Sequence, residues 1–160
     1  MTPPDSQTGP IVRHAAPADL QRIGRLGALL VEAHYGFDPR RFLAARPGAQ
    51  EGYASFISTQ LEDPDVAVIV AEDKGDVVGY TYAAVEGYDY MALRGPAGVL
   101  HDVIVDPRHR GRGAGRLLLE AALEFLRSRS GAARPSRRWR WQGSWRASCS
   151  PSGVTAPSST

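Results

Sequence analysis

The sequence lacks several features that define large protein classes. Cys149 is the only cysteine among 160 residues, which excludes an internal disulfide framework and makes a cytoplasmic protein our expectation. No run of 18 or more apolar residues is present, so we expect no membrane span. The first residues also lack a basic stretch followed by an apolar one, which argues against a secretory signal. We expect no metal site.

Acidic residues are absent from the tail, which we define as residues 134–160. The tail contains five arginines, so the formal charge of +2 leaves residues 1–133 at −3. A mildly acidic main body argues against a nucleic-acid-binding domain. One alternative stays open, in which tail arginines contact phosphates and tail tryptophans stack on bases.

Composition divides the chain into three segments. We expect a flexible N-terminus over residues 1–9 and one domain over residues 10–133. The whole chain is 42% hydrophobic, which is enough to form a core. The tail holds all three tryptophans and seven serines. We favour a frameshift in GC-rich DNA as the explanation of this abrupt change in composition. The second explanation is a disordered basic tail. A third explanation is that Arg138–Trp141 forms a strand beside the one expected at 99–105, and that dimerisation supplies the remaining part of the fold.

Hydrophobic periodicity predicts the element order β-α-α-β-β-β-α, which is typical of a mixed α/β layer domain. The expected strands cover residues 11–14, 66–71, 77–85 and 99–105, and the expected helices cover 19–36, 51–62 and 113–130.

The segment from Val103 to Arg116 joins a strand to a glycine-rich turn and a helix start. Gly111, Gly113 and Gly115 permit a positive φ and a close approach of ligand to backbone. The first amides of a helix have no internal partner, and they bind phosphate oxygens. Positive charge comes from Arg108, Arg110, Arg112 and Arg116. The segment predicts a pyrophosphate site; an ordinary turn that caps a helix is the simpler alternative.

Spacing excludes two other phosphate-binding loops. A P-loop needs GxxxxGK[ST], and no lysine lies in this segment. A dinucleotide fingerprint needs GxGxxG with an acid about 20 residues further on. Here Arg116 replaces the last glycine, and the residues at that distance include no acid.

The longer context is more specific. Val105-Asp106-Pro107, then Arg110-x-x-Gly113-x-Gly115 and an amphipathic helix, resembles the acyl-CoA signature R/Q-x-x-G-x-G/A of the GNAT-type N-acetyltransferase superfamily. An overlapping register from Arg108 also fits, but the first keeps the family's usual distance from Pro107. The resemblance covers roughly residues 10–131. It implies a GNAT-like α/β fold with a mixed, mostly antiparallel sheet flanked by helices, incomplete at the C-terminus.

The resemblance also implies acetyl-CoA as co-substrate and a primary amine, in a small molecule or a peptide, as acceptor. The strand would offer backbone groups to the pantetheine arm, and the turn would enclose the pyrophosphate. The implied coenzyme-binding residues are Val103, Ile104, Val105, Arg110, Gly111, Arg112, Gly113, Ala114, Gly115 and Arg116.

Candidate catalytic residues lie on and beside the same strand. Residues 100–105, LHDVIV, resemble the L-E-D-hydrophobic-hydrophobic-V strand of polyamine-type acetyltransferases, with His101 at the glutamate position. Direct transfer needs a neutral amine, and a histidine is a suitable base. Asp102 or Glu86 could serve instead, directly or through water. The simpler interpretations are a polar residue on a strand face for His101 and a structural hydrogen bond for Asp102.

Tyrosines offer a further expectation. Tyr80, Tyr82, Tyr88 and Tyr90 could line an acceptor pocket, although aromatic residues in strands more often belong to the core. The family pattern continues after the helix with more strands and a tyrosine that protonates the thiolate, whereas no tyrosine follows Tyr90 here. Two further hypotheses therefore remain: a CoA-binding protein with impaired catalysis, and a homodimer.

Overall fold

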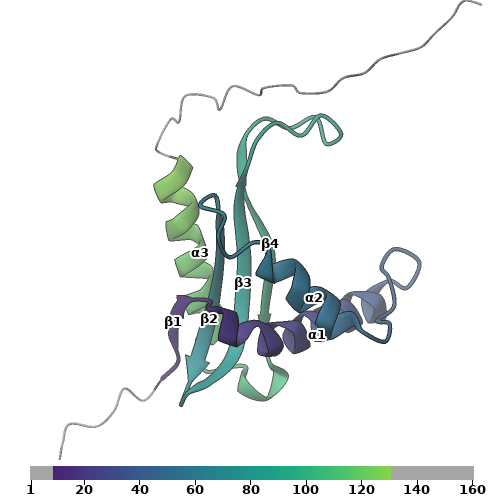
Figure 1. Ribbon diagram of the computed structural model, residues 1–160, viewed down its shortest axis with the longest axis vertical. Helices are drawn as coiled ribbons and strands as arrows, with labels where there is room; N and C mark the ends of the chain where they lie inside the picture. Colours follow the sequence, from purple (N-terminus) through teal and green to yellow (C-terminus); the bar gives the residue numbers. More distant parts are fainter. Residues whose placement is uncertain (1–8, 131–160) are drawn as a thin grey trace, which may run out of the picture.

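The computed structural model describes residues 9–130, and its architecture is a four-stranded sheet between two helical layers (Figure 1). The tail, most of the expected N-terminal segment and the nucleic-acid alternative lie outside the described residues. The strands are β1 (Ile11–His14), β2 (Val66–Asp73), β3 (Asp76–Glu86) and β4 (Ala97–Val105), and the helices are α1 (Leu20–Phe37), α2 (Ala49–Ser58) and α3 (Ala114–Ser130). The expected element order is confirmed.

The sheet is antiparallel throughout, in the order β1-β2-β3-β4. The inner strands β2 and β3 are apolar on both faces because helices cover both sides of them, which explains their continuous apolar runs. Among the described strands, β4 pairs only with β3 and forms an edge.

Alternate residues of the strands belong to two separate cores. On one face, Ile23, Leu26 and Ile57 of α1 and α2 pack against Tyr80 and Ile104. The other face carries α3, whose residues Ala114 and Leu118 pack on Ile69, Ala71 and Val78. Figure 1 shows α3 on one side of the sheet with α1 and α2 on the other. No helix in the described range is both long and apolar enough to cross a bilayer.

Helix α2 is shorter than expected at its C-terminus. It ends at Ser58 instead of residue 62, because the amides of Thr59 and Gln60 bond back by three residues, to Phe56 and Ile57. Such bonds tighten the last turn and end the helix. The residues after α2 therefore form a turn that leads into β2.

Glycines allow α1 and α2 to approach closely. A Cβ atom at Gly27 would lie only 2.4 Å from the Tyr53 ring. We expect Gly27→Ala to lower the free energy of unfolding by about 1–3 kcal/mol, because the ring must move in a packed interface. Urea denaturation measures this. Gly36→Ala is the matched control in the same helix, since a Cβ there meets nothing within 4 Å. That change should stabilise by up to about 1 kcal/mol, and equal effects of the two variants would contradict the prediction.

Candidate functional site

The end of β4 continues into the expected glycine turn. Gly111 and Gly113 have φ values of +78° and +90°, and α3 begins at Ala114. The amide of Leu117 bonds to the carbonyl of Gly113 at 3.1 Å, so the amides of residues 114–116 precede the helical ladder. These amides and the positive end of the 17-residue helix are suited to an anion.

Asp106 anchors this turn, a role that the sequence analysis missed. Its side chain is 3% exposed and accepts hydrogen bonds from Arg22 Nη2 at 2.7 Å and Arg108 Nη2 at 2.9 Å. It also accepts from the backbone amide of Arg108 at 3.0 Å. These bonds, those from Arg108 above all, hold the pKa of Asp106 well below its usual range. Asp106 therefore fixes the turn to α1 and to β4.

The contribution of Asp106 to stability depends on pH. Because its folded-state pKa is depressed, the contribution is complete above the unfolded-state pKa of about 4 and is lost as pH falls below it. We expect Asp106→Asn to lower the free energy of unfolding by about 2–3 kcal/mol at pH 7. Urea denaturation at pH 7 and pH 3 measures this difference, which should shrink at pH 3. Asp76→Asn, at the exposed first residue of β3, is the control. A difference that is the same at both pH values would contradict the assignment.

The four arginines of the turn have different partners. Arg108 bonds to Asp106 and so holds the loop, although its side chain is exposed. Arg110 Nε donates to the carbonyl of Val105 at 3.2 Å. Arg112 lies 3.5 Å from Asp73, and Arg116 lies 2.7 Å from Glu120. The last three side chains are exposed, and their assignment as coenzyme ligands stays a prediction.

A β-bulge in the middle of β4 brings two predicted catalytic residues to one face. The register pairs Tyr82 with Asp102 and then Ala83 with Leu100, which leaves His101 as the extra residue. His101 stacks on Tyr82 at 4.8 Å between ring centroids, while Asp102 contacts Tyr80 on the same face. Regular alternation would have placed these neighbours on opposite sides of the sheet.

The bulge also brings His101 to Glu86, at the end of β3. The Nε2 atom of His101 lies 2.8 Å from Glu86 Oε1. The other oxygen of Glu86 accepts a hydrogen bond from Arg94 Nη2. His101 and Glu86 are each about one-third exposed, at 34% and 35%, so solvent and ligands can reach them.

Asp102, the third predicted residue, has buried partners. It accepts hydrogen bonds from the hydroxyls of Tyr53, on α2, and Tyr80, the latter at 3.3 Å. The single hydroxyl hydrogen of Tyr80 is shared with Tyr53 Oη, which is the nearer acceptor at 2.7 Å. Burial, followed by the neighbouring groups, raises the pKa of both tyrosines, so their hydroxyls stay protonated donors. These contacts support the interpretation of Asp102 as a structural hydrogen-bonding residue and of Tyr80 as a core residue.

The predicted site residues thus fall into two groups on β4 and the elements beside it. Glu86, His101 and Asp102 come together at the bulge, and the glycine turn follows at the end of the strand. Tyr53 and Arg94 also belong to the bulge group and were not foreseen. In the part of the chain that the structure describes, no group of three His, Cys, Asp or Glu residues could hold a metal ion.

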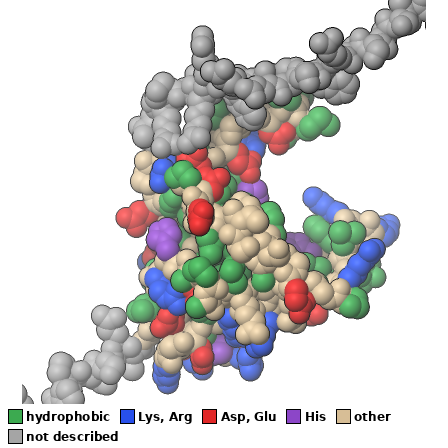
Figure 2. All heavy atoms as spheres, in the orientation of Figure 1, with side chains coloured by type: hydrophobic (Ala, Val, Ile, Leu, Met, Phe, Trp, Pro, Cys, Tyr) green, Lys and Arg blue, Asp and Glu red, His purple; other side chains and the backbone are tan. Residues whose placement is uncertain are grey.

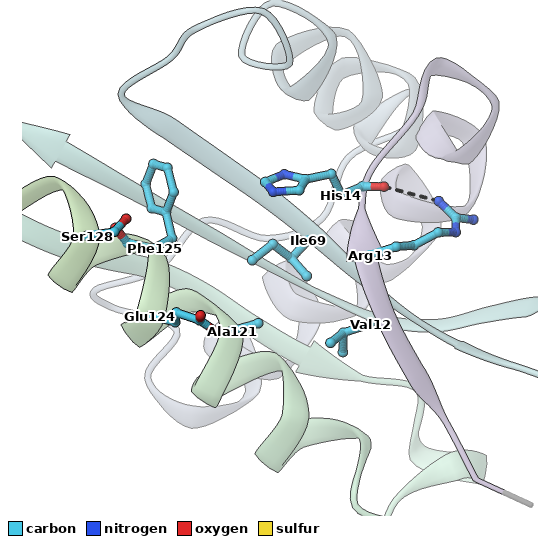
Figure 3. A pocket seen from close by; sticks show the side chains of 8 residues that line it. All are labelled: Val12, Arg13, His14, Ile69, Ala121, Glu124, Phe125 and Ser128. Atoms are coloured by element: carbon cyan, nitrogen blue, oxygen red, sulfur yellow. Dashed lines mark hydrogen bonds between the residues drawn. The ribbon is translucent and has the colours of Figure 1, made fainter. Parts of the chain in front are cut away.

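A separate hollow of about 330 Å³ lies between β1 and α3 (Figure 3). Its lining residues are Val12, Arg13, His14, Ile69, Ala121, Glu124, Phe125 and Ser128. None of the predicted coenzyme-binding or catalytic residues lines this hollow. We therefore place the candidate site at the bulge and the turn, where the polar groups converge.

Several solved structures share this fold. A mutant of the BH1408 protein from Bacillus halodurans has a TM-score of 0.63 and 22% identity, over 74% of this chain and 76% of that chain. A GCN5-related N-acetyltransferase from Ralstonia eutropha JMP134 has a TM-score of 0.57 and 22% identity, over 76% and 78%. A Clostridium acetobutylicum protein, described as a predicted acetyltransferase with acetyl-CoA, has a TM-score of 0.57 and 14% identity, over 76% and 75%. At these identities the likeness shows the fold.

The family follows from the sequence comparison. The profile of the Acetyltransferase (GNAT) family matches residues 29–135, and the chain belongs to this family. It is also 29% identical over 77 residues to the uncharacterized N-acetyltransferase YhfO of Bacillus subtilis (strain 168). That match covers 47% of this chain and 49% of the relative, so it spans about half the length of each.

Proposed function

We propose that the protein is an N-acetyltransferase that moves the acetyl group of acetyl-CoA to a primary amine. The observation that carries the proposal is the arrangement along one strand. A bulge with a reachable histidine is followed, at the end of β4, by two positive-φ glycines and the free amides of α3. Family membership supports the same reaction class.

The coenzyme would lie along β4 and the turn. Backbone groups of Val103, Ile104 and Val105 would bind the pantetheine arm, since the outer side of β4 has no partner strand in residues 9–130. The amides from Arg110 to Arg116 would bind the pyrophosphate. At Gly111 and Gly113 a Cβ would meet nothing within 4 Å, so a phosphate can approach the backbone there.

His101 is the base in this proposal, with Glu86 as its positioning residue. A carboxylate only accepts hydrogen bonds, so Glu86 holds the hydrogen on Nε2 and leaves the lone pair of Nδ1 for a proton. The amine nitrogen then attacks the thioester carbonyl, and Nδ1 takes the amine proton. The C–S bond breaks, and the CoA sulfur leaves as a thiolate that is protonated afterwards. Asp102 supports the bulge through Tyr53 and Tyr80.

Calorimetric titration with acetyl-CoA and CoA, followed by an acetyl-transfer assay on a panel of primary amines, tests the proposal. We expect saturable binding of both coenzymes and transfer to at least one amine class. Absence of binding would reject the coenzyme site. Binding without transfer to any amine would instead support a CoA-binding protein with impaired catalysis.

A further inference from the structure

The connection between β3 and β4 displays four large apolar side chains to solvent. Tyr88, Tyr90, Met91 and Leu93, which we call the hairpin tip, are 66%, 82%, 95% and 91% exposed. Single exposed apolar residues are common on soluble proteins, but a cluster on one short turn indicates a binding surface.

The hairpin tip is held in a defined conformation. The Asp89 carboxylate accepts hydrogen bonds from the amides of Met91 and Ala92, both at 3.0 Å. The backbones of Asp89 and Arg94 pair with each other at 2.8 and 2.9 Å. The rings of Tyr88 and Tyr90 stack at 6.2 Å. A turn built this way presents its side chains at little entropic cost to a ligand.

Arg94 connects the hairpin tip to the proposed base. Its guanidinium bonds to Glu86, whose other oxygen lies 2.8 Å from His101 Nε2, and it also lies 4.0 Å from Asp89. Two residues on each side separate the Glu86–Ala97 pair from the Asp89–Arg94 pair, so the hairpin tip follows directly after the paired ends of β3 and β4. The hairpin tip and His101 are therefore linked through Asp89, Arg94 and Glu86.

The hairpin also bends toward the face that carries His101. Figure 1 shows it curving away from α3, to the side of the sheet that α1 and α2 cover. Figure 2 shows the molecule hollowed between this hairpin and the segment that joins α1 to α2. The carboxylates of Glu86, Asp89 and Asp102 lie near His101 and the base of the hairpin, where they attract a cationic amine. Figure 2 shows Lys or Arg side chains on the opposite wall of the hollow.

We propose that the hairpin tip binds the apolar part of the acceptor, so that the site selects an amine bearing an aromatic or similarly apolar group. This inference rests on the proposed function. The ammonium end meets the acidic groups around His101 and gives its first proton to solvent, so that Nδ1 is free to take the second during the attack, while the body of the molecule lies on the rings and the thioether of the hairpin tip. Tyrosine faces also attract a cation during approach.

Steady-state acetylation of tyramine and 2-phenylethylamine, compared with n-propylamine and putrescine, tests the inference. We expect a higher kcat/KM for the two aryl amines. The double variant Tyr90→Ala/Met91→Ser should lower that value by roughly 10-fold or more for the aryl amines, mainly through KM. It should leave n-propylamine within about twofold, because that substrate has no aromatic group for the hairpin tip to bind.

Controls separate the inference from the function on which it rests. Ile11→Ser alters an exposed apolar residue on β1, at the opposite edge of the sheet, and should change neither substrate class. Calorimetry with CoA should give the same affinity for all variants.

Transfer to every amine without preference, or equal losses for all amines in the double variant, would overturn the inference alone. The double variant could keep the preference for aryl amines while light scattering shows that it has changed from a dimer to a monomer. That result would assign the hairpin tip to a subunit interface. No transfer to any amine would overturn the proposed function and this inference with it.

Discussion

Replacing Gly113 with aspartate should weaken CoA binding at least 100-fold while the fold persists. The backbone at Gly113 has a φ of +90°, a region that costs other residues about 1–3 kcal/mol. The new carboxylate would also point into space where the structure leaves room for a phosphate. A 100-fold loss corresponds to about 2.8 kcal/mol, which strain and charge repulsion together readily exceed. Isothermal titration calorimetry with CoA measures the loss.

Two further variants separate strain from charge and position. Gly113→Ala keeps the strain without the charge, and its loss should be smaller than that of the aspartate. Gly48→Asp introduces the same residue at a φ of +83°, also with nothing near its Cβ, but in the loop before α2. Its CoA affinity should match that of the unaltered protein. If Gly48→Asp and Gly113→Asp lose affinity equally, the effect is general destabilisation and the pyrophosphate site is wrong.

Local features of the sequence were sufficient to predict the turn. Gly111 and Gly113 lie within a few residues of the strand end and the helix start, and their effect on φ does not depend on distant contacts. The order of the elements was predictable for a similar reason, because β2 and β3 are short continuous apolar runs and the apolar residues of α3 recur at the helical period. The helix end at Ser58 was not predictable from periodicity, since tighter turn bonds decide it.

The bulge and its partners depend on contacts between distant segments. Tyr53 and Asp102 are separated by 49 positions, and no local pattern marks them as partners. Alternation along β4 predicts opposite faces for His101 and Asp102, and only the pairing with β3 shows that they share one. Asp106 marked the expected end of a strand, yet its role comes from Arg22, 84 positions away. Long-range polar pairing was therefore the part that the sequence could not supply.

Substituting alanine for His101 should lower kcat by about 100- to 10,000-fold, the usual contribution of a positioned base. The affinity for CoA should stay unchanged, because the glycine turn follows the C-terminal end of β4, beyond the bulge. The side chain is 34% exposed and its partner Glu86 can be solvated in its absence, so the fold should tolerate the change. Steady-state kinetics on the best amine, with calorimetry on CoA, measures both quantities.

Chemical rescue distinguishes a base from a structural residue. Free imidazole should restore part of the activity of His101→Ala, because the cavity left beside Tyr82 and Glu86 accepts a ring of the same shape. Glu86→Gln should lower kcat less, by about 10-fold, since the amide can still contact Nε2 but no longer fixes its hydrogen. Asp102→Asn should act through stability instead, because the carboxylate holds Tyr53 and Tyr80, and imidazole should not rescue it. A His101→Ala enzyme with unaltered kcat would transfer the role of base to Asp102, to Glu86 or to a water molecule that one of them orients.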